Sequence, residues 1–493
     1  MGDAAFSALE NLASIDLLLH LFLGITIGLV IGLLPGLGGV VGMSLFLPFL
    51  FGMDPFVGMA MLVGFAAVGQ TSDTYPSVLL GVPGSAGSQA TILDGYALAR
   101  QGQAARALGA SFSASMIGGV FGAFSLLAVI TVARPLVQAL GSPELFMLTV
   151  LGIATVGVLV RGDPLLGLLS ALFGIMIGTI GGAPATPEYR YVFGSLYLWD
   201  GVPLVAVAMG LFAIPEVLTL LVNRIRIAGK AELEGGMFDG FRETLRHKGL
   251  VLRSSLLGTG IGAVPGMGGS VVDWMAYGIA QQTSRDSSQF GKGDIRGVIA
   301  PESANNAKEG GTLMPTLILG IPGSGTSAVL LGGLILMGLT PGPSMLAENL
   351  DVTLTVVWAL VIANVVATTV CFFLSHPISR ITLIPAQILA PFLIVLFFAA
   401  SYQATNNWGD IFSVLVIGLL GFAMKLVGWP RAPALIGFVL AANLERYLHL
   451  SISRYEFSWL LFPPVLVIGF LVFLMALGGP LYRYYQASGT GGK

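Results

Sequence analysis

The chain alternates between long apolar runs and short breaks rich in Pro and Gly, a pattern typical of a polytopic helical membrane protein. One apolar, Gly-spaced run ends in Pro-Gly-Leu-Gly-Gly at 35–39, and a close copy ends in Pro-Gly-Met-Gly-Gly at 265–269. Because Pro removes a backbone donor and Gly raises the conformational cost of a helix, no α-helix continues through such a pentapeptide. Both runs are therefore predicted to be helices that break inside an apolar segment.

A second pair of breaks follows in the same order. Tyr-Pro-Ser at 75–77 leads to Pro-Gly-Ser at 83–85, and Met-Pro-Thr at 314–316 leads to Pro-Gly-Ser at 322–324, without a gap in the alignment. Matched breaks in two halves indicate the solute site of a secondary transporter, because broken helices expose N–H and C=O groups. The predicted fold is an all-α polytopic membrane protein of two repeats with broken or re-entrant helices.

The predicted organisation is a first transmembrane repeat at 1–226, a cytoplasmic linker at 227–249 and a second transmembrane repeat at 250–493. About twelve transmembrane spans are expected in all. Apart from the broken helices, apolar spans are expected at roughly 104–133, 143–160, 164–182, 201–223, 350–375, 380–400, 410–428, 431–444 and 459–478.

The distribution of the 23 Lys and Arg residues predicts the orientation. If the basic stretch 224–253 is cytoplasmic, counting spans outward places most of the other cations on the same side. The N-terminus is then periplasmic and the C-terminus cytoplasmic. The first repeat starts outside and the second starts inside, so the repeats are expected to be inverted. The side of the polar stretch 281–313 stays open.

Composition narrows the function. Of 493 residues, 55% are hydrophobic and only 10% are charged, which is too few charges for a soluble globular surface of this size. The net charge of −2 disfavours a nucleic-acid partner. Cys371 is the single cysteine, the four histidines form no metal-like spacing, and no nucleotide-binding or hydrolase motif occurs. We therefore expect no enzymatic activity, no bound cofactor and no ATP hydrolysis.

The four breaks supply candidate anion ligands. Glycine N–H groups allow a solute to approach the backbone, and a hydroxyl-rich helix start presents free N–H groups and partial positive charge to an anion. A simple kink, or a helix N-cap without a ligand, is the alternative for each break. The candidate substrate-binding residues are Gly36, Gly38, Gly39, Ser85, Ser88, Gly266, Gly268, Gly269, Ser324, Thr326 and Ser327.

Polar groups and carbonyls beside the breaks are candidate ligands for a coupling cation, because hard cations prefer oxygen. Na⁺ is favoured modestly over H⁺, since carboxamides bind a metal ion but cannot relay a proton. The alternative is that the polar side chains, together with Asp94 and Asp273, lie in solvated loops. The candidate cation-binding residues are Leu34, Val264, Asp73, Glu302, Asn305 and Asn306.

Glycines with small-xxx-small spacing occur in both broken runs: Gly24, Gly28 and Gly32 in the first, and Gly258 and Gly262 in the second. This spacing is typical of close helix packing in lipid. We therefore interpret these glycines as packing positions.

Several motifs together resemble the large membrane subunit of tripartite tricarboxylate transporters, the TctA family. They are Pro-Gly-Leu-Gly-Gly at 35–39, Gly-Val-Pro-Gly-Ser with Leu-Asp-Gly-Tyr and Gly-Gln-Ala-Ala-Arg-Ala-Leu-Gly within 81–109, and Pro-Glu-Ser-Ala-Asn-Asn-Ala, Leu-Gly-Ile-Pro-Gly-Ser and Gly-Leu-Thr-Pro-Gly-Pro within 301–343. The resemblance covers essentially the whole chain. It implies uptake of carboxylates across a bacterial inner membrane by secondary transport.

The resemblance also implies two partners: a small membrane subunit of the TctB kind and a periplasmic binding protein of the TctC kind. The function predicted from both arguments is the large transport subunit of a binding-protein-dependent secondary transporter for carboxylates such as citrate, coupled to Na⁺ or H⁺. Two other classes stay open from the residues alone. One is a non-transporting scaffold or channel subunit, and the other is an intramembrane enzyme.

Overall fold

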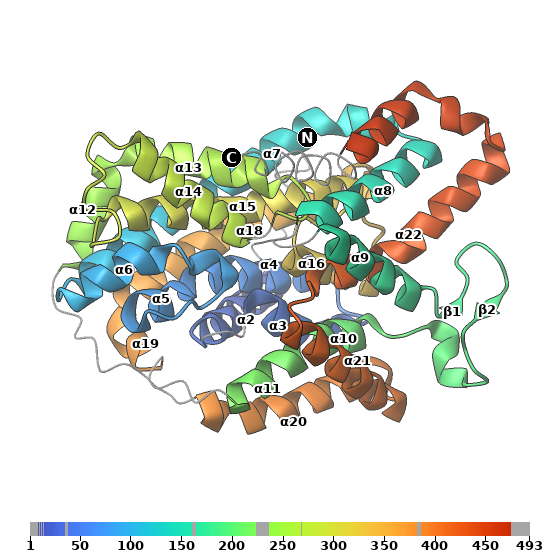
Figure 1. The fold of residues 1–493 in the computed structure, drawn as a ribbon, viewed down its shortest axis with the longest axis horizontal. Coiled ribbons are helices and arrows are strands. Elements are labelled where there is room, and N and C mark those ends of the chain that lie inside the picture. The colour runs from blue at the N-terminus through green and yellow to red at the C-terminus, as the bar shows by residue number, and fades with distance from the viewer. Residues whose placement is uncertain are drawn as a thin grey trace, which may run out of the picture.

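The apolar runs form helices, and the Pro-Gly breaks fall between them (Figure 1). This is seen in a computed structural model that describes residues 8, 10, 12, 14–34, 38–159, 164–222, 236–267, 269–381 and 386–474. Capping residues fix several helix starts. Asp54 accepts the backbone N–H groups of Phe56 and Val57 at 2.9 and 3.3 Å at the start of α4, where Pro55 supplies a preset φ angle.

The first half of the chain contains helices on both sides of two breaks and one short hairpin. Its elements are α2 (Ile15–Gly32), α3 (Gly38–Ser44), η1 (Leu47–Leu50), α4 (Pro55–Ser72), α5 (Thr74–Leu80), η2 (Ala86–Ser88), α6 (Thr91–Arg100), α7 (Ala104–Gln138), α8 (Ser142–Leu159), α9 (Pro164–Gly178), β1 (Gly181–Gly182), β2 (Tyr189–Arg190), η3 (Leu196–Asp200), α10 (Leu204–Ala208), the π-helical η4 (Met209–Ala213) and α11 (Ile214–Val222). The two strands pair antiparallel, with Gly181 opposite Arg190.

The second half repeats the broken pattern and ends in longer helices. Its elements are α12 (Met237–Arg246), α13 (Lys248–Gly262), α14 (Gly269–Thr283), α15 (Arg296–Leu319), α16 (Gly325–Leu336), α17 (Pro343–Ala347), α18 (Leu350–Phe373), α19 (Ser375–Ile381), α20 (Ala386–Thr405), α21 (Trp408–Leu426), α22 (Ala432–Tyr455) and η5 (Ser458–Leu461). Helix α12 lies within the predicted linker and packs on α7.

Two helix pairs with the same design pack through glycines. Helix α2 lies along α4, where a side chain on Gly28 would meet the Phe65 carbonyl oxygen at 2.7 Å. Helix α13 lies along α15, where a side chain on Gly262 would meet the Lys308 carbonyl oxygen at 2.7 Å. Gly258 is pressed in the same way against the backbone of Ala304. The glycine spacing therefore serves close helix packing, as interpreted from the sequence.

The two Pro-Gly-Ser breaks share one backbone structure. Each preceding helix ends at a left-handed glycine, Gly81 with φ 66° and Gly320 with φ 70°. The N–H of Val82 then donates to the Pro76 carbonyl at 3.3 Å, and the N–H of Ile321 donates to the Pro315 carbonyl at 3.0 Å. Glycine is required at 81 and 320 because its missing Cβ allows positive φ without strain.

Helix α15 overturns one alternative drawn from the sequence. Glu302, Asn305 and Asn306 do not lie in a solvated loop, because they are buried within this helix. Asp73, between α4 and α5, and Asp273, in α14, are buried as well. The polar residues of α15 sit among α4, α7, α13 and α14, which supply hydrogen-bond partners in place of water.

Five helical segments among the described residues are long and apolar enough to cross a membrane: Ile15–Gly32, Pro55–Leu80, Ala104–Gln138, Leu350–Phe373 and Trp408–Leu426. Several shorter apolar helices accompany them, so the chain is an all-α polytopic membrane protein. The span expected at 380–400 has different bounds, since α19 ends at Ile381 and α20 runs from Ala386 to Thr405. The total of about twelve spans stays a prediction.

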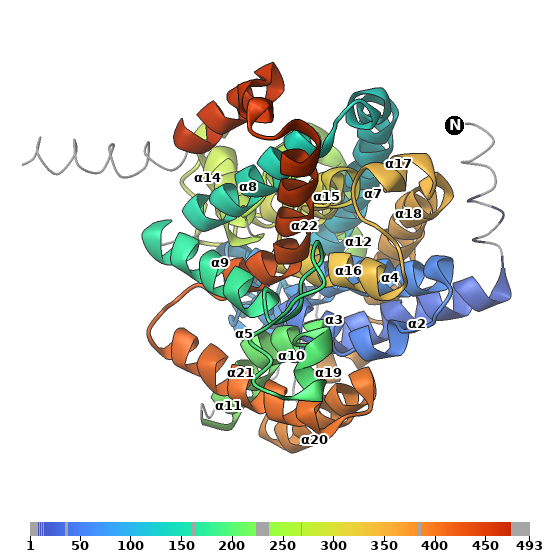
Figure 2. The ribbon, with the colours of Figure 1, turned by 90° about the vertical axis from the view of Figure 1, so that its right-hand side faces the viewer.

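The helices surround a centre made of α4, α15 and α16. Helix α15 runs beside α7, α13 and α14, while α10, α11, α20 and α21 form a separate group at the bottom of Figure 1. The hairpin of β1 and β2 extends away from the helices at the right-hand edge. Figure 2 shows α16 between α22 and α4, both of which it contacts.

Candidate functional site

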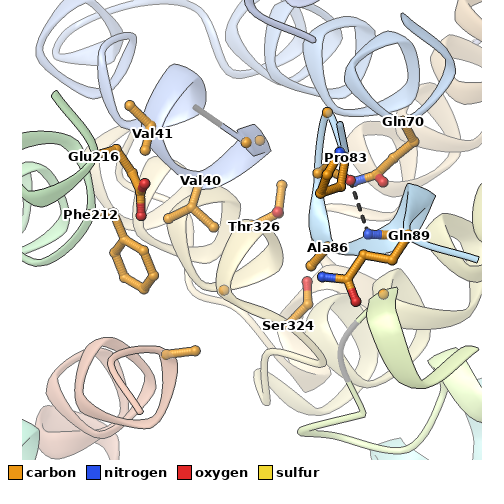
Figure 3. Close-up of a pocket in the computed structure, with 18 of the residues that line it drawn as sticks. Val40, Val41, Gln70, Pro83, Ala86, Gln89, Phe212, Glu216, Ser324 and Thr326 are labelled. Atoms are coloured by element: carbon orange, nitrogen blue, oxygen red, sulfur yellow. Dashed lines mark hydrogen bonds between the residues drawn. The ribbon is translucent and has the colours of Figure 1, made fainter. Parts of the chain in front are cut away.

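Segments from all four breaks line one cavity of about 420 Å³ (Figure 3). Gly38 and Gly39 come from the first break, and Gly269 comes from its copy in the second half. The first Pro-Gly-Ser break contributes residues 83–87, and the second contributes 324–326. Helices that are far apart in sequence therefore bring the broken backbone of both halves to one place.

Each Pro-Gly-Ser break forms a reciprocal cap. Ser85 Oγ accepts the Gly87 N–H at 3.0 Å, and Ser88 Oγ accepts the Ser85 N–H at 3.2 Å. In the second break, Ser324 Oγ accepts the Ser327 N–H at 3.2 Å, and Ser327 Oγ accepts the Ser324 N–H at 2.7 Å. The N-cap alternative therefore describes the local geometry, and it leaves Ser85 and Ser324 in the cavity wall.

The other predicted substrate ligands are placed differently. Ser88 and Ser327 are buried inside their caps and lie outside the cavity lining, whereas Thr326 lines it. Gly266 lies outside the lining too, and its N–H donates to the Gly323 carbonyl at 3.1 Å. Gly36 and Gly268 fall outside the residues that the structure describes.

Lys308 is the cavity residue that reasoning from the sequence missed. Its ammonium is buried, contacts Glu309 Oε1 at 2.9 Å and donates to Asn305 Oδ1 at 3.3 Å. A Cβ on Gly269 would lie 3.1 Å from Lys308 Nζ, so a larger residue at this point of the wall would press against the ammonium. The available signal was a lysine within the polar stretch 301–311, shortly before Met-Pro-Thr at 314–316.

Two glutamines extend the polar lining. Gln70 Oε1 is buried without a hydrogen-bond partner among the described residues. Gln89 Oε1 accepts the indole N–H of Trp274 at 3.3 Å, across the two halves of the chain. In Figure 3, Gln70 and Gln89 lie on the side of the cavity opposite Phe212 and Glu216, with Ser324 and Thr326 between them.

The opposite side is a charged edge that the sequence did not reveal. Glu216 Oε1 accepts from Arg431 at 2.9 Å, and Glu216 Oε2 contacts Lys425 Nζ at 2.6 Å. Arg431 also donates to the Leu211 carbonyl at 3.0 Å, and its guanidinium lies over the Phe212 ring, 5.2 Å from the ring centroid, in a cation–π contact. Phe212 lies within the π-helical turn η4 and Glu216 follows it in α11, and such turns are often found at functional sites.

The side chains among the predicted cation ligands have different hydrogen-bond partners. Asp73 Oδ2 accepts the Ser85 hydroxyl just behind the cavity wall, and Asp73 Oδ1 has no partner in the described chain. Asn306 Nδ2 donates to Thr71 at 2.9 Å and to Asn364 at 3.0 Å. Glu302 is held by hydroxyl groups instead, those of Thr74, Thr91 and Ser115.

Leu34 and Val264 occupy equivalent turns after α2 and α13. Their N–H groups donate to the Ile31 and Ile261 carbonyls at 3.0 Å each. Within the described ranges, His, Cys, Asp and Glu form no group of three that could hold a metal ion. A metal ion bound here would therefore need carbonyl, hydroxyl or carboxamide oxygens as most of its ligands.

The comparisons with known proteins identify the family of the chain. A sequence profile described as the tripartite tricarboxylate transporter TctA family matches residues 18–436. The chain belongs to the TctA family. It is 30% identical over 446 residues to an "Uncharacterized 52.8 kDa protein in TAR-I ttuC' 3'region" of Agrobacterium vitis, an alignment that covers 89% of this chain and 88% of that protein.

A second Agrobacterium vitis relative, the "Uncharacterized protein in TAR-II ttuC' 3'region", is 31% identical over 230 residues, which are 45% of this chain and 93% of the relative. No solved structure matches the chain. This member of the TctA family is thus a multi-pass membrane subunit of a transporter, and the family is a transport component, not an enzyme family.

Proposed function

We propose that this TctA-family chain is the large subunit of a binding-protein-dependent secondary transporter that imports carboxylates, di- or tricarboxylates such as citrate. The observation that supports this most is the buried Lys308 ammonium in the cavity wall. An ammonium has three N–H donors, and Glu309 and Asn305 account for two of them. A carboxylate of the solute would accept the third.

Backbone donors support the same class of solute. Helix α16 begins beside the cavity, so the N–H groups of its first turn carry partial positive charge toward it. Ser85, Ser324 and Thr326 add hydroxyl donors to the wall. We propose that these groups, with the glycine N–H groups at 36–39 and 266–269, bind the carboxylates.

Cation coupling is the second part of the proposal. Each negative charge moved inward against an inside-negative potential costs about 2.3 kcal/mol per 100 mV, and a trivalent solute costs about three times as much. Four carboxyl groups near the cavity, those of Asp73, Asp273, Glu302 and Glu309, are buried, and Lys308 is a nearby cation for Asp73, Asp273 and Glu309. We therefore propose that Na⁺ or H⁺ enters with the solute.

The cation ligands remain those expected from the sequence. The carbonyls of Leu34 and Val264, together with Asp73, Glu302, Asn305 and Asn306, would offer oxygen atoms to Na⁺. Glu302 already accepts hydrogen bonds from hydroxyl groups, and no group of three acidic, His or Cys side chains occurs in the described chain. Both observations favour carbonyl and carboxamide oxygens as the ligands of Na⁺.

The partners and the movement follow from family membership and the duplicated breaks. TctA proteins are the large subunits of tripartite transporters, so we propose a TctB-like membrane subunit and a TctC-like periplasmic protein. The 182–200 segment, with its exposed aromatic residues, would be an outer docking surface. Inverted repeats in the bacterial inner membrane would expose the cavity alternately to each side.

Counterflow in liposomes tests the function. The chain is reconstituted with its presumed partner subunits, and exchange of radiolabelled citrate or succinate is measured. Lys308→Gln is expected to weaken apparent solute affinity about tenfold or more, because a hydrogen bond to a charged group contributes about 1.5–3 kcal/mol. Lys292→Gln, in an exposed loop, is the control and should leave the affinity unchanged.

The double variant Lys308→Gln/Glu309→Gln separates charge loss from a broken ion pair. It removes both charges, so no unpaired carboxylate stays buried, and it should still bind citrate weakly. Wild-type affinity in both variants would refute the role of Lys308. Flux of solute down its gradient without any accumulation would instead favour a channel subunit over a secondary transporter.

A further inference from the structure

The start of α6 belongs to the first half of the chain, but carboxyl groups of the second half hold it. Asp273 Oδ2 of α14 accepts the Ala90 N–H at 2.6 Å. Glu302 Oε1 of α15 accepts the hydroxyl of Thr91 at 2.7 Å. Ala90 and Thr91 are the N-cap and first residue of α6, so the positive end of this helix lies between two buried acids.

The two acids differ in how completely they are bonded. Glu302 Oε2 accepts two further hydroxyl groups, from Thr74 at 2.9 Å and Ser115 at 3.1 Å. Asp273 Oδ1 is buried and has no hydrogen-bond partner in the described part of the chain. Leaving a buried carboxylate oxygen unpaired costs free energy, so this atom calls for a positively charged or hydrogen-bond-donating occupant.

None of the charged side chains around Asp273 serves as the partner of its Oδ1 atom. The charged groups that face it are Glu302 and Lys308 of α15 and Asp73, between α4 and α5. The ammonium of Lys308 is already engaged by Glu309. A metal ion would need several oxygen ligands together, and no group of three acidic, His or Cys side chains converges among the described residues.

A proton needs no other ligand than Oδ1 itself. It would neutralise the carboxylate while Oδ2 continues to accept the Ala90 N–H, so the contact between the halves persists. Asp273 also lies one helical turn after Gly269, which lines the cavity beside Lys308. The charge of Asp273 therefore acts on any anion held at that wall.

We propose that Asp273 is the site at which one of the coupling protons binds. This inference rests on the proposed carboxylate transport and names its coupling ion. Asp273 in the carboxylate form accepts a proton from the outer side together with the solute, and the carboxylic acid releases it inside. A neutral Asp273 favours the anion in the cavity, and by linkage the bound anion favours the proton to the same extent.

The test uses the complex of the chain and its partner subunits in liposomes. Asp273→Asn imitates the neutral form, so citrate or succinate counterflow should remain within about threefold of wild type. Accumulation driven by an inward proton gradient should fall at least tenfold. Asp94→Asn is the matched control: Asp94 is equally buried, but its oxygens accept from Gly293 and Asp294 at 2.8 Å and from Tyr277 at 2.9 Å.

A binding measurement covers the case in which Asp273→Asn does not fold. Purified wild-type complex in weak buffer, mixed with a solute that is already fully ionised, should take up protons, and its affinity should decrease as pH rises. Folded Asp273→Asn should lose both effects, while Asp94→Asn keeps them. Proton-driven accumulation by Asp273→Asn, or solute binding by wild type without proton uptake, would overturn the proposal.

The outcomes separate this inference from the proposed function. If wild type neither exchanges nor binds either carboxylate, the proposed function is wrong. If wild type accumulates a carboxylate only with Na⁺ and Asp273→Asn accumulates it equally well, the transport function holds and the assignment of Asp273 is wrong.

Discussion

Two serines of a single helix cap face different surroundings. Ser324 and Ser327 exchange hydrogen bonds at the start of α16, so each satisfies an N–H that the helix leaves unpaired. Ser324 lines the cavity, whereas Ser327 is buried behind it. The same chemistry thus serves the fold at both positions, and at Ser324 it also faces the cavity.

This difference gives a prediction for substitutions in the cap. Ser324→Ala should weaken apparent solute affinity about tenfold, since a hydroxyl donor to a carboxylate contributes about 1.5–3 kcal/mol. Both Ser324→Ala and Ser327→Ala should lower thermal stability, because loss of a cap costs about 0.5–2 kcal/mol, but Ser327→Ala should leave affinity close to wild type. Counterflow at varied solute concentration, with melting curves, measures both. Unchanged affinity in Ser324→Ala and in Ser85→Ala would contradict the hydroxyl roles.

Side chains in the cavity wall divide into those that the sequence identified and those that it did not. The duplicated motifs identified Ser85, Ser324 and Gly269, because Pro and Gly residues that break a helix can be recognised from the local sequence. Lys308 and Glu216 could not be assigned, since their significance depends on which distant helix supplies a partner. Local chemistry predicts a break, whereas a buried ion pair is a tertiary property.

Glycines of α13 allow α15 to pack closely against this helix. Gly258 of α13 is pressed against the Ala304 backbone, whereas Gly260 of the same helix faces open space. Small residues let helices approach closely, and in a membrane this contact replaces much of the hydrophobic driving force. The arrangement places α15, with Lys308 and Asn305, beside the second break.

Substituting these two glycines should therefore have opposite effects. Gly258→Ala should destabilise the protein by about 1–3 kcal/mol, because the added methyl group overlaps the Ala304 carbonyl and separates the helices. Gly260→Ala, its control, should be neutral or slightly stabilising, since Ala is the better helix former by about 1 kcal/mol. Melting temperatures of the purified variants provide the measurement. Equal melting temperatures would show that this contact does not hold the helix.

At the level of elements, hydropathy alone predicted long apolar helices better than polar buried ones. The limits of α21 follow its apolar run closely. Helix α15, in contrast, contains Glu302, Asn305 and Lys308, so its sequence is hydrophilic although the helix is buried. Its helical form depends on partners such as Thr91 and Thr71 on other helices. No single-segment pattern contains that information.

For the whole molecule, the distribution of cations predicts which side of the membrane each loop occupies. The 182–200 segment is expected outside, and the basic region that includes α12 is expected in the cytoplasm. Arg190 of the 182–200 segment pairs with Glu445 at 2.8 Å, so this segment is linked to α22. The inverted relation of the two halves depends on the same assignment.

Cysteine labelling from outside the cell tests the orientation directly. The native Cys371 is buried, so the unmodified chain should react little with a bulky, membrane-impermeant maleimide. Phe193→Cys, at a position 87% exposed in the outer segment, should be labelled on intact spheroplasts. Asp239→Cys, in α12 where the aspartate side chain is 61% exposed, should be labelled only after the membrane is permeabilised. Removing its ion pair with Arg242 should cost little, because exposed pairs contribute about 0–1 kcal/mol. Labelling of Asp239→Cys on intact spheroplasts, with Phe193→Cys protected, would reverse the assignment of the two sides. Labelling of both variants from outside would rule out the predicted number of membrane crossings between positions 193 and 239.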